Sequence, residues 1–440
     1  MTQFRVLPAR RGDAYLLKSR RGSYLIDGGA QESLLPEMLT DRKVNKLRAV
    51  VCSSPSPERL GGIIELMEAG HPVAEYWLPD RLEILPELAR RFSGDWEGWL
   101  GLVSSSNRGG DSTLYDWGGG INPLPDDNSL RRLQGAAVLI GLAMTACLGW
   151  APYKGMSRDA FFGGDRADPS SGLAHFFGWT LELLSDRAAT RWENDEGAAG
   201  RILRRMGWRL SLGGSLEETV LLCGRLLQAE AEMLSGPEGS SIKGTVQSLT
   251  MAAMLTAMVA KTESRVRFFR QTGRLEDHLV PKHPLKCLNG IEVSPLSGVV
   301  PLVSPERLFR ETRGLTGRSE GLVFQYGDRG CGVLFCGDTK MNFLGSEQPV
   351  ILDRPTVIAA PRQGNCSSDV AYARIESQEP ERDMWVRSHF SYARKVSDNF
   401  KWQANKQCLN NCVHHAVQEI LLEYSGQSWI VKSGGSCICG

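Results

Sequence analysis

Short apolar runs separated by turn residues fill the first eighty positions of the chain. Short runs bounded by Gly, Pro, Asn or Asp are typical of strands, whereas apolar positions three or four apart are typical of helices. These patterns predict strands at 4–7, 14–18, 23–27, 47–52 and 73–78, and helices at 34–39 and 60–67. The Arg20-Arg21-Gly22 turn predicts a hairpin between the second and third strands. Strands that alternate with helices favour a layered α/β architecture.

The pattern changes between residues 99 and 270, where Gly-, Ser- and Asp-rich loops alternate with long helical patterns. Helices are expected at 130–148, 172–185, 197–205, 216–234 and 246–261. The fourth has a clear start, because Ser215 and Glu218 fit the Ser-x-x-Glu capping box that satisfies otherwise unpaired helix N–H groups. We therefore expect a helical insertion over 99–270.

Strand patterns return after residue 285. Strands are expected at 288–293, 322–326, 332–336, 356–360, 384–387 and 429–431, with one helix at 413–424. Four parts are therefore predicted: a first part of the core at 1–98, the insertion at 99–270, a second part of the core at 271–400, and a Cys-rich, zinc-binding tail at 401–440.

Charge and composition narrow the class of protein. A formal net charge of +1 does not indicate a nucleic-acid partner, because duplex binding needs a concentrated basic face. The first residues lack the pattern of a secretory signal, and 11 cysteines without such a signal indicate a reducing compartment. The apolar stretches 135–150 and 249–260 fall short of the roughly 20 residues that span a bilayer. We therefore expect a cytoplasmic protein without membrane contact.

Four ordered stretches resemble proteins of the metallo-β-lactamase fold, especially hydrolase domains of DNA-uptake competence proteins and their bacterial-defence relatives. They are Gly12-Asp13-Ala14-Tyr15-Leu16-Leu17, Tyr24-Leu25-Ile26-Asp27-Gly28-Gly29, the segment from Val51 to Gly62, and Val333-Leu334-Phe335-Cys336-Gly337-Asp338. The resemblance implies an α/β fold of the metallo-β-lactamase type, an αββα sandwich, with a large helical insertion and a small Cys-rich C-terminal tail. The insertion itself is not covered by the resemblance.

The chain departs from this family where the family binds metal. Members carry His-x-(His or Asp)-x-Asp-His before a Gly-Gly pair, because two zinc ions need several converging nitrogen and oxygen donors. The matching positions here are Ser54, Ser56, Glu58 and Arg59, and the later Ala-Pro-His-His-Gly segment reads Ala360-Pro361-Arg362-Gln363-Gly364. Serine hydroxyls are poor zinc donors, and an arginine is a permanent cation. We therefore expect a vestigial site, with no catalytic residues and no catalytic metal pair.

Asp338 remains as a candidate ligand, and Glu58 as a longer carboxylate. The alternative for Asp27 and Asp338 is structural, since short acids at strand ends commonly bond to loop amides. A further expectation is that Arg59 or Arg362 pairs with Asp338 and fills the vacated pocket.

The tail carries two close cysteine pairs, Cys408-x-x-x-Cys412 and Cys437-x-Cys439. Such pairs can place four thiolates around one zinc ion, so these four residues are the expected ligands of a structural zinc. The tail also resembles Cys-rich tails of defence-associated members of this fold. His414 or His415 is an alternative fourth ligand, and free or disulfide-linked cysteines are the rival interpretation.

The function expected from these observations is that of a catalytically inactive pseudoenzyme acting as a binding, scaffold or regulatory subunit. By resemblance, its setting is a bacterial antiviral defence system, and its protein partner an effector enzyme or a protease. Protein–protein interaction is expected at the insertion, because binding surfaces are often placed on loops. One alternative is an active nuclease or phosphodiesterase with a single metal held by Glu58, Asp338 and a third, unidentified donor. Another is a protease substrate activated by cleavage in loop 104–111 or 236–243.

Overall fold

A computed structural model describes two large parts of the chain, one at each end of the sequence. The described residues are 2–9, 12–30, 33–82, 251, 255, 258–259, 262–276, 278–293, 321–328, 330–344, 348–388, 396–411, 416–417 and 419–437. The chain divides into two compact units. Unit 1 comprises Met1–Asp80, Glu263–Pro295 and Arg318–Gly440, and unit 2 comprises Arg81–Thr262 and Leu296–Gly317. Nearly all described residues belong to unit 1. The helices expected within 99–234 lie outside them.

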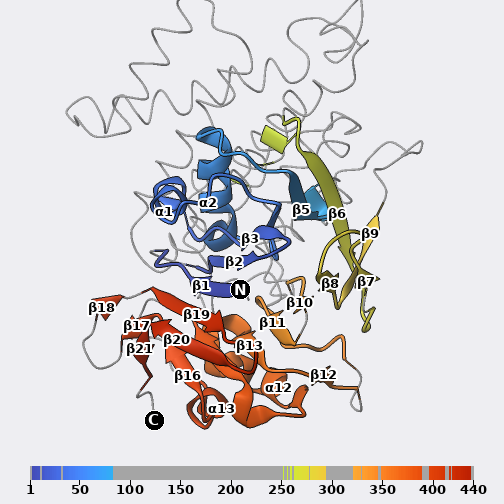
Figure 1. Ribbon diagram of the computed structural model, residues 1–440. Coiled ribbons are helices and arrows are strands. Elements are labelled where there is room, and N and C mark those ends of the chain that lie inside the picture. The colour runs from blue at the N-terminus through green and yellow to red at the C-terminus, as the bar shows by residue number, and fades with distance from the viewer. Residues whose placement is uncertain are drawn as a thin grey trace, which may run out of the picture. The chain divides into compact units, whose positions relative to one another are not determined.

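Unit 1 contains a mixed sheet of nine strands, in the order β20-β19-β1-β2-β3-β4-β5-β6-β9. In that order the strands are Trp429–Ser433, Ile420–Tyr424, Gln3–Val6, Tyr15–Ser19, Gly22–Ile26, Ala49–Val51, Glu75–Pro79, Arg265–Gln271 and Gly290–Val293. Strands β3 to β6 run parallel, and the other neighbours pair antiparallel. β1 therefore joins elements from the two ends of the chain (Figure 1).

A second mixed sheet has eight strands, in the order β21-β16-β15-β13-β11-β10-β8-β7. In that order the strands are Gly435–Ser436, Lys406–Cys408, Met384–Arg387, Thr356–Ala359, Cys331–Phe335, Phe324–Asp328, Leu285–Cys287 and His278–Leu279. Strands β11, β13, β15 and β16 run parallel. Two small pairs complete the strands: β12 (Val350–Leu352) with β14 (Ile375–Ser377), and β17 (Asn410–Asn411) with β18 (Ala416–Val417).

Two sequence predictions about these strands are wrong. The helix expected at 413–424 is replaced by β18 and β19, and β19 alternates buried and less buried positions as a strand does. The boundary expected at 270 falls inside β6, which pairs in parallel with β5 and belongs to unit 1. β19 is paired with β1, and β6 with β5, so each is held by a strand far away in the sequence.

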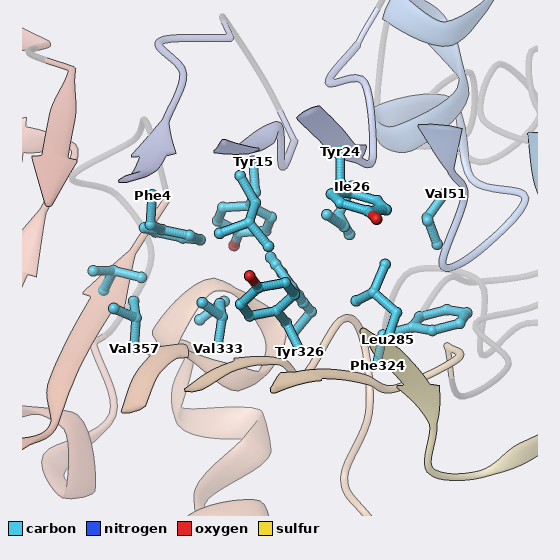
Figure 2. Close-up of a cluster of buried hydrophobic side chains, with 14 of the residues drawn as sticks. Phe4, Tyr15, Tyr24, Ile26, Val51, Leu285, Phe324, Tyr326, Val333 and Val357 are labelled. Carbon is cyan, nitrogen blue, oxygen red and sulfur yellow. The ribbon is translucent and has the colours of Figure 1, made fainter. Parts of the chain in front are cut away.

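The two sheets share one core. Buried side chains from β1 to β6 face buried side chains from β8, β10, β11, β13 and β15, and Figure 2 shows the two rows pointing at one another. Aromatic rings join the rows: Phe4 lies 6.1 Å from Phe335, and Phe269 lies 5.7 Å from Phe324, between ring centroids. Burying each such side chain contributes about 1.5–3 kcal/mol, so this shared layer is a main source of stability.

Helices lie on the faces that point away from this core. α1 (Leu35–Asp41) and α2 (Pro57–Glu68) lie beside β2 and β3, and α12 (Asp369–Tyr372) and α13 (Asp398–Lys401) lie beside the second sheet (Figure 1). Short 3-10 turns form at Pro361–Gly364, Cys366–Ser368 and Pro380–Arg382. The described part of the chain is thus of the α/β class. None of its helices is long and apolar enough to cross a membrane.

Close contact fixes the position of α2. Gly62 lies so near the turn after β3 that a Cβ atom there would be 2.1 Å from the Gly28 carbonyl oxygen. The Gly28 N–H in turn donates to the Arg59 carbonyl oxygen at 2.9 Å. The first turn of α2 is therefore held against the end of β3.

Candidate functional site

Arg59 lies in the first turn of α2 and is among the largest fully buried side chains that the structure describes. A buried guanidinium is always charged and must find acceptors, because leaving it unpaired in the interior is costly. The acceptors come from loops at the carboxyl ends of strands. Asp27 follows β3, Ser53 follows β4, and Asp338 follows β11. Strands of both sheets therefore deliver polar groups to one place.

Three carboxylates surround the Arg59 guanidinium. Nη2 lies 2.7 Å from Asp13 Oδ2 and 2.9 Å from Asp338 Oδ1, and Nε donates to Asp338 Oδ2 at 3.1 Å. Nη1 is paired with Asp27 Oδ2. Asp13 and Asp27 are almost fully buried, whereas the Asp338 side chain is 35% exposed. We call Arg59, Asp13, Asp27 and Asp338 the Arg59 cluster.

Asp27 is held in place from several directions. Its backbone is left-handed, with φ 57°, and its carboxylate accepts from Ser53 N at 2.7 Å and from Ser53 Oγ at 2.8 Å. Ser53 Oγ also accepts from Arg59 Nη1 at 3.0 Å. Burial raises the pKa of Asp27 to about 6, although Arg59 opposes this shift. Burial also opposes the charge on Arg59, but Asp338, Asp27 and Asp13 raise its pKa well above the ordinary value.

Asp13 connects the Arg59 cluster to the second sheet. Ser388, directly after β15, donates its hydroxyl to Asp13 Oδ1. The Tyr15 hydroxyl lies 3.0 Å from Ser388 Oγ and 3.2 Å from Asp13 Oδ1. Burial, followed by the charge of Asp13, raises the pKa of Tyr15 well above its usual value, so Tyr15 is a neutral donor here. Residues 13 and 388 are thus joined by a buried network.

The turn that follows β13 carries Arg362, the second arginine of the site expected from the sequence. Arg362, Gln363 and Gly364 all have positive φ, at 46°, 59° and 75°. The Arg362 N–H donates to the Gly337 carbonyl oxygen at 2.9 Å, which places its backbone beside the Asp338 loop. Its Nε is buried without a hydrogen-bond partner among the described residues. The expected pairing with Asp338 is therefore made by Arg59.

The remaining predicted site residues take peripheral positions. Ser54 is buried, and its carbonyl oxygen accepts from Cys52 Sγ at 3.1 Å. Ser56 is the N-cap residue of α2 but makes no side-chain capping bond. Glu58 is partly exposed, and its carbonyl oxygen packs against Gly12, where a Cβ atom would be 1.7 Å away. The structure thus brings Arg59 and Asp338 together and adds Asp13, Tyr15, Ser53 and Ser388, to which the sequence assigned no role.

These residues do not fit a pair of zinc ions. Metal ligands must offer free lone pairs, whereas the oxygens of Asp13, Asp27 and Asp338 are directed at a cation that cannot lose its charge. Ser54 and Ser56 offer only hydroxyl groups, which are poor donors for zinc. The chemistry of this donor set is that of a closed ion-pair network.

Two of the predicted zinc ligands are close together elsewhere in unit 1. Cys408 ends β16, Cys437 follows β21, and their Sγ atoms are 2.9 Å apart in buried surroundings. Antiparallel pairing of Cys408 with Gly435 explains this proximity. The other two predicted ligands, Cys412 and Cys439, lie outside the described residues. Among the residues that are described, no group of three or more His, Cys, Asp or Glu side chains is placed to hold a metal ion.

Models of known protein families were compared with the chain, and none matches it. A comparison with curated proteins gives no match either. The function is therefore inferred from the residues of the Arg59 cluster and their geometry.

Proposed function

We propose that this chain is a metallo-β-lactamase-type αββα sandwich that has lost its metal site and works as a binding, scaffold or regulatory subunit. The observation that carries the proposal is the Arg59 guanidinium, which is buried and contacts Asp13, Asp27 and Asp338. A fixed positive charge among these acids replaces a metal ion by a side chain. The chain then keeps the fold of a hydrolase without the means to activate water.

Electrostatics support this interpretation. Three carboxylates at close range repel one another unless a cation lies between them, and at 4 Å each pair of like charges costs about 4 kcal/mol at an effective dielectric constant near 20. A metal supplies two positive charges and an open coordination position for substrate or water. A guanidinium supplies one charge and no such position. The Arg59 cluster therefore stabilises the fold but offers no Lewis acid.

The fold is the second support. Two mixed sheets share a core, helices lie on their outer faces, and polar residues gather where parallel strands end. These features suit the resemblance in stretches 12–17, 24–29, 51–62 and 333–338. By the same resemblance, we place the protein in a bacterial antiviral defence system with an effector enzyme or a protease as its partner. The insertion expected at 99–270 is the proposed partner-binding part.

Hydrolysis assays combined with metal titration test the loss of activity. The unmodified protein is expected to show no nuclease, phosphodiesterase or lactamase activity with zinc, manganese or magnesium. A variant with Ser54→His, Ser56→His, Glu58→Asp, Arg59→His and Arg362→His is expected to bind divalent metal more tightly than the unmodified protein. Asp338→Asn in the restored background is the matched control and should remove that gain.

Activity of the unmodified protein that disappears in Asp338→Ala would overturn the proposal in favour of an active hydrolase. Cleavage of the native chain within 104–111 or 236–243 by a protease from the same host, with release of an activity, would favour the protease-substrate alternative instead.

A further inference from the structure

Arg387, the last residue of β15, is a buried arginine with which no carboxylate pairs among the described residues. It is 3% exposed, and its Nε donates to the Gln363 carbonyl oxygen at 3.1 Å. By contrast, buried Arg59 contacts three carboxylates, and buried Arg267 pairs with two glutamates. A buried charge without a counter-ion is costly, so an anion that reaches Arg387 would stabilise the folded chain.

The contacts of Arg387 direct it toward the turn after β13. Gly364 in this turn has φ 75°, and a Cβ atom there would lie 2.9 Å from Arg387 Cδ and 3.3 Å from its Nε. Trp385, two residues before Arg387, belongs to the hydrophobic cluster that also contains residues of α12 and α13, and alternation puts Arg387 on the same face of the sheet. Ser388, the next residue, contacts Asp13 instead. Arg387 therefore points away from the Arg59 cluster.

Arg362 lies in the same turn, and it too pairs with no carboxylate in the part of the chain that the structure describes. Its Nε is buried without a hydrogen-bond partner there, although the residue as a whole is partly exposed. Arg362 and Gln363 both have left-handed backbones, which are unfavourable for residues other than glycine. Such conformations persist where the surroundings require them, and they cluster at ligand-binding sites.

Tyr372 of α12 is a third donor near Arg387. It is 7% exposed, and its ring stacks on Trp385 with 5.1 Å between ring centroids. Its hydroxyl oxygen is buried and makes no hydrogen bond of normal geometry. Burial raises the pKa of Tyr372, whereas Ser397 and the charge of Arg387 lower it, so both lie near a hydroxyl that stays neutral. The carboxylate of Asp369, in the same helix, accepts from Ser397 Oγ.

We propose that the turn Pro361–Gly364 is a phosphate-binding site, in which Arg362 and Arg387 hold the phosphate oxygens and Tyr372 donates its hydroxyl. Guanidinium groups match phosphate with paired N–H donors. Two guanidiniums balance a phosphate group, whose charge at pH 7 is about −1.5 to −2, better than they balance a carboxylate. Free phosphate and the phosphate group of a nucleotide offer the same chemistry. This inference goes beyond the proposed function and does not rest on it.

Calorimetric titration of the full chain with inorganic phosphate, at constant ionic strength set with chloride, is the first measurement. We expect saturable binding and a melting temperature that rises with phosphate concentration. Arg362→Met should weaken binding about 10- to 100-fold, because hydrogen bonds between charged groups are the strong ones, and Arg362→Lys should restore part of it. Arg270→Met is the matched control, because Arg270 pairs with Asp80 and is largely exposed. It should bind phosphate as the unmodified protein does.

A nucleoside monophosphate is the second probe. Tighter binding than that of inorganic phosphate would support the site with a nucleotide as its ligand, and equal binding would support it with free phosphate. Both gains should be lost in Arg362→Met.

The role of Arg387 is tested by Arg387→Met, which keeps the length of the side chain and removes its charge. Without phosphate this variant should melt close to the unmodified protein, because an unbalanced buried charge is lost, and phosphate should no longer raise its melting temperature. Gly364→Ala keeps both charges but would displace Arg387, so it should weaken binding as well.

Absence of saturable phosphate binding would overturn the site, and so would binding that persists unchanged in Arg362→Met and Arg387→Met. A melting temperature that falls sharply in Arg387→Met without phosphate would show that Arg387 has only a structural role. The proposed function is tested separately by metal titration and hydrolysis, so the failure of one proposal is distinguishable from the failure of the other.

Discussion

Arg59 and Asp338 meet through two atoms each, with Nε 3.1 Å from one carboxylate oxygen and Nη2 2.9 Å from the other. They are 279 residues apart in sequence: Arg59 lies in helix α2, and Asp338 lies in the loop after β11 of the second sheet. Nε donates a hydrogen bond to Asp338 Oδ2, whereas Nη2 contacts Oδ1 as an ion pair without hydrogen-bond geometry. The other nitrogen then points at Asp27, so the three acids are held in a single arrangement.

Replacing Arg59 by Met is expected to lower the free energy of unfolding by about 3–5 kcal/mol, the cost of removing one partner from a buried ion pair. Asp13 and Asp27 would remain buried without their cation. Urea unfolding followed by circular dichroism measures the change. Arg270→Met is the control, because Arg270 pairs with Asp80 but its side chain is 54% exposed, and exposed pairs contribute about 0–1 kcal/mol. Equal effects in the two variants would contradict the structural role of the Arg59 cluster.

The raised pKa of Asp27 predicts a pH dependence of stability. Burial raises this pKa from 3.8 to about 6, so the folded state binds the proton more tightly than the unfolded state between these values. The contribution of Asp27 to the unfolding free energy must therefore fall as pH rises from 3.8 to about 6, and stay constant above. Unfolding curves of the unmodified protein and Asp27→Asn across this range isolate that contribution. A difference that grows with pH would mean that Arg59 outweighs burial.

Gly62→Ala is expected to destabilise the fold by about 1–3 kcal/mol, as overpacking generally does. The added Cβ atom would lie 2.1 Å from the Gly28 carbonyl oxygen, a backbone atom that cannot move independently. Without that contact, alanine in a helix is more stable than glycine by up to about 1 kcal/mol. The sign of the change in unfolding free energy therefore shows whether the contact exists. Gly273→Ala is the control, because nothing lies within 4 Å of its Cβ position. A higher melting temperature in Gly62→Ala would show that α2 is not held against β3.

Most strands of unit 1 follow from their apolar patterns, and β1 to β5 lie close to the positions expected from sequence. β6 was missed because one of its buried positions carries a charge. Arg267 is 4% exposed and pairs with Glu75 and Glu292, so the apolar alternation that marks a strand is broken there. The apolar run at 420–424 is so short that its sequence pattern fits a helix as well as a strand. It forms a strand because it pairs with β1 and β20.

The candidate site could be predicted only in part. Arg59 and Asp338 could be singled out because both lie in stretches that resemble the metal-binding segments of another fold family. Asp13 and Ser388 are 375 residues apart, and no local pattern connects them. Their contact depends on how the two sheets pack, which short-range periodicity does not encode.

The place of β1 in the first sheet has a consequence for biosynthesis. Its hydrogen-bonding edge is paired with β19, and the side chains of Gln3 and Glu423, 420 residues apart, touch across that pair. At a translation rate of about 5–20 residues per second, the partner of β1 emerges from the ribosome roughly 20–80 s after β1 itself. During that interval the edge of β1 is open to strands of other nascent chains. Folding of this protein in the cell is therefore expected to depend on chaperones that cover β1 until β19 has been synthesised and can pair with it.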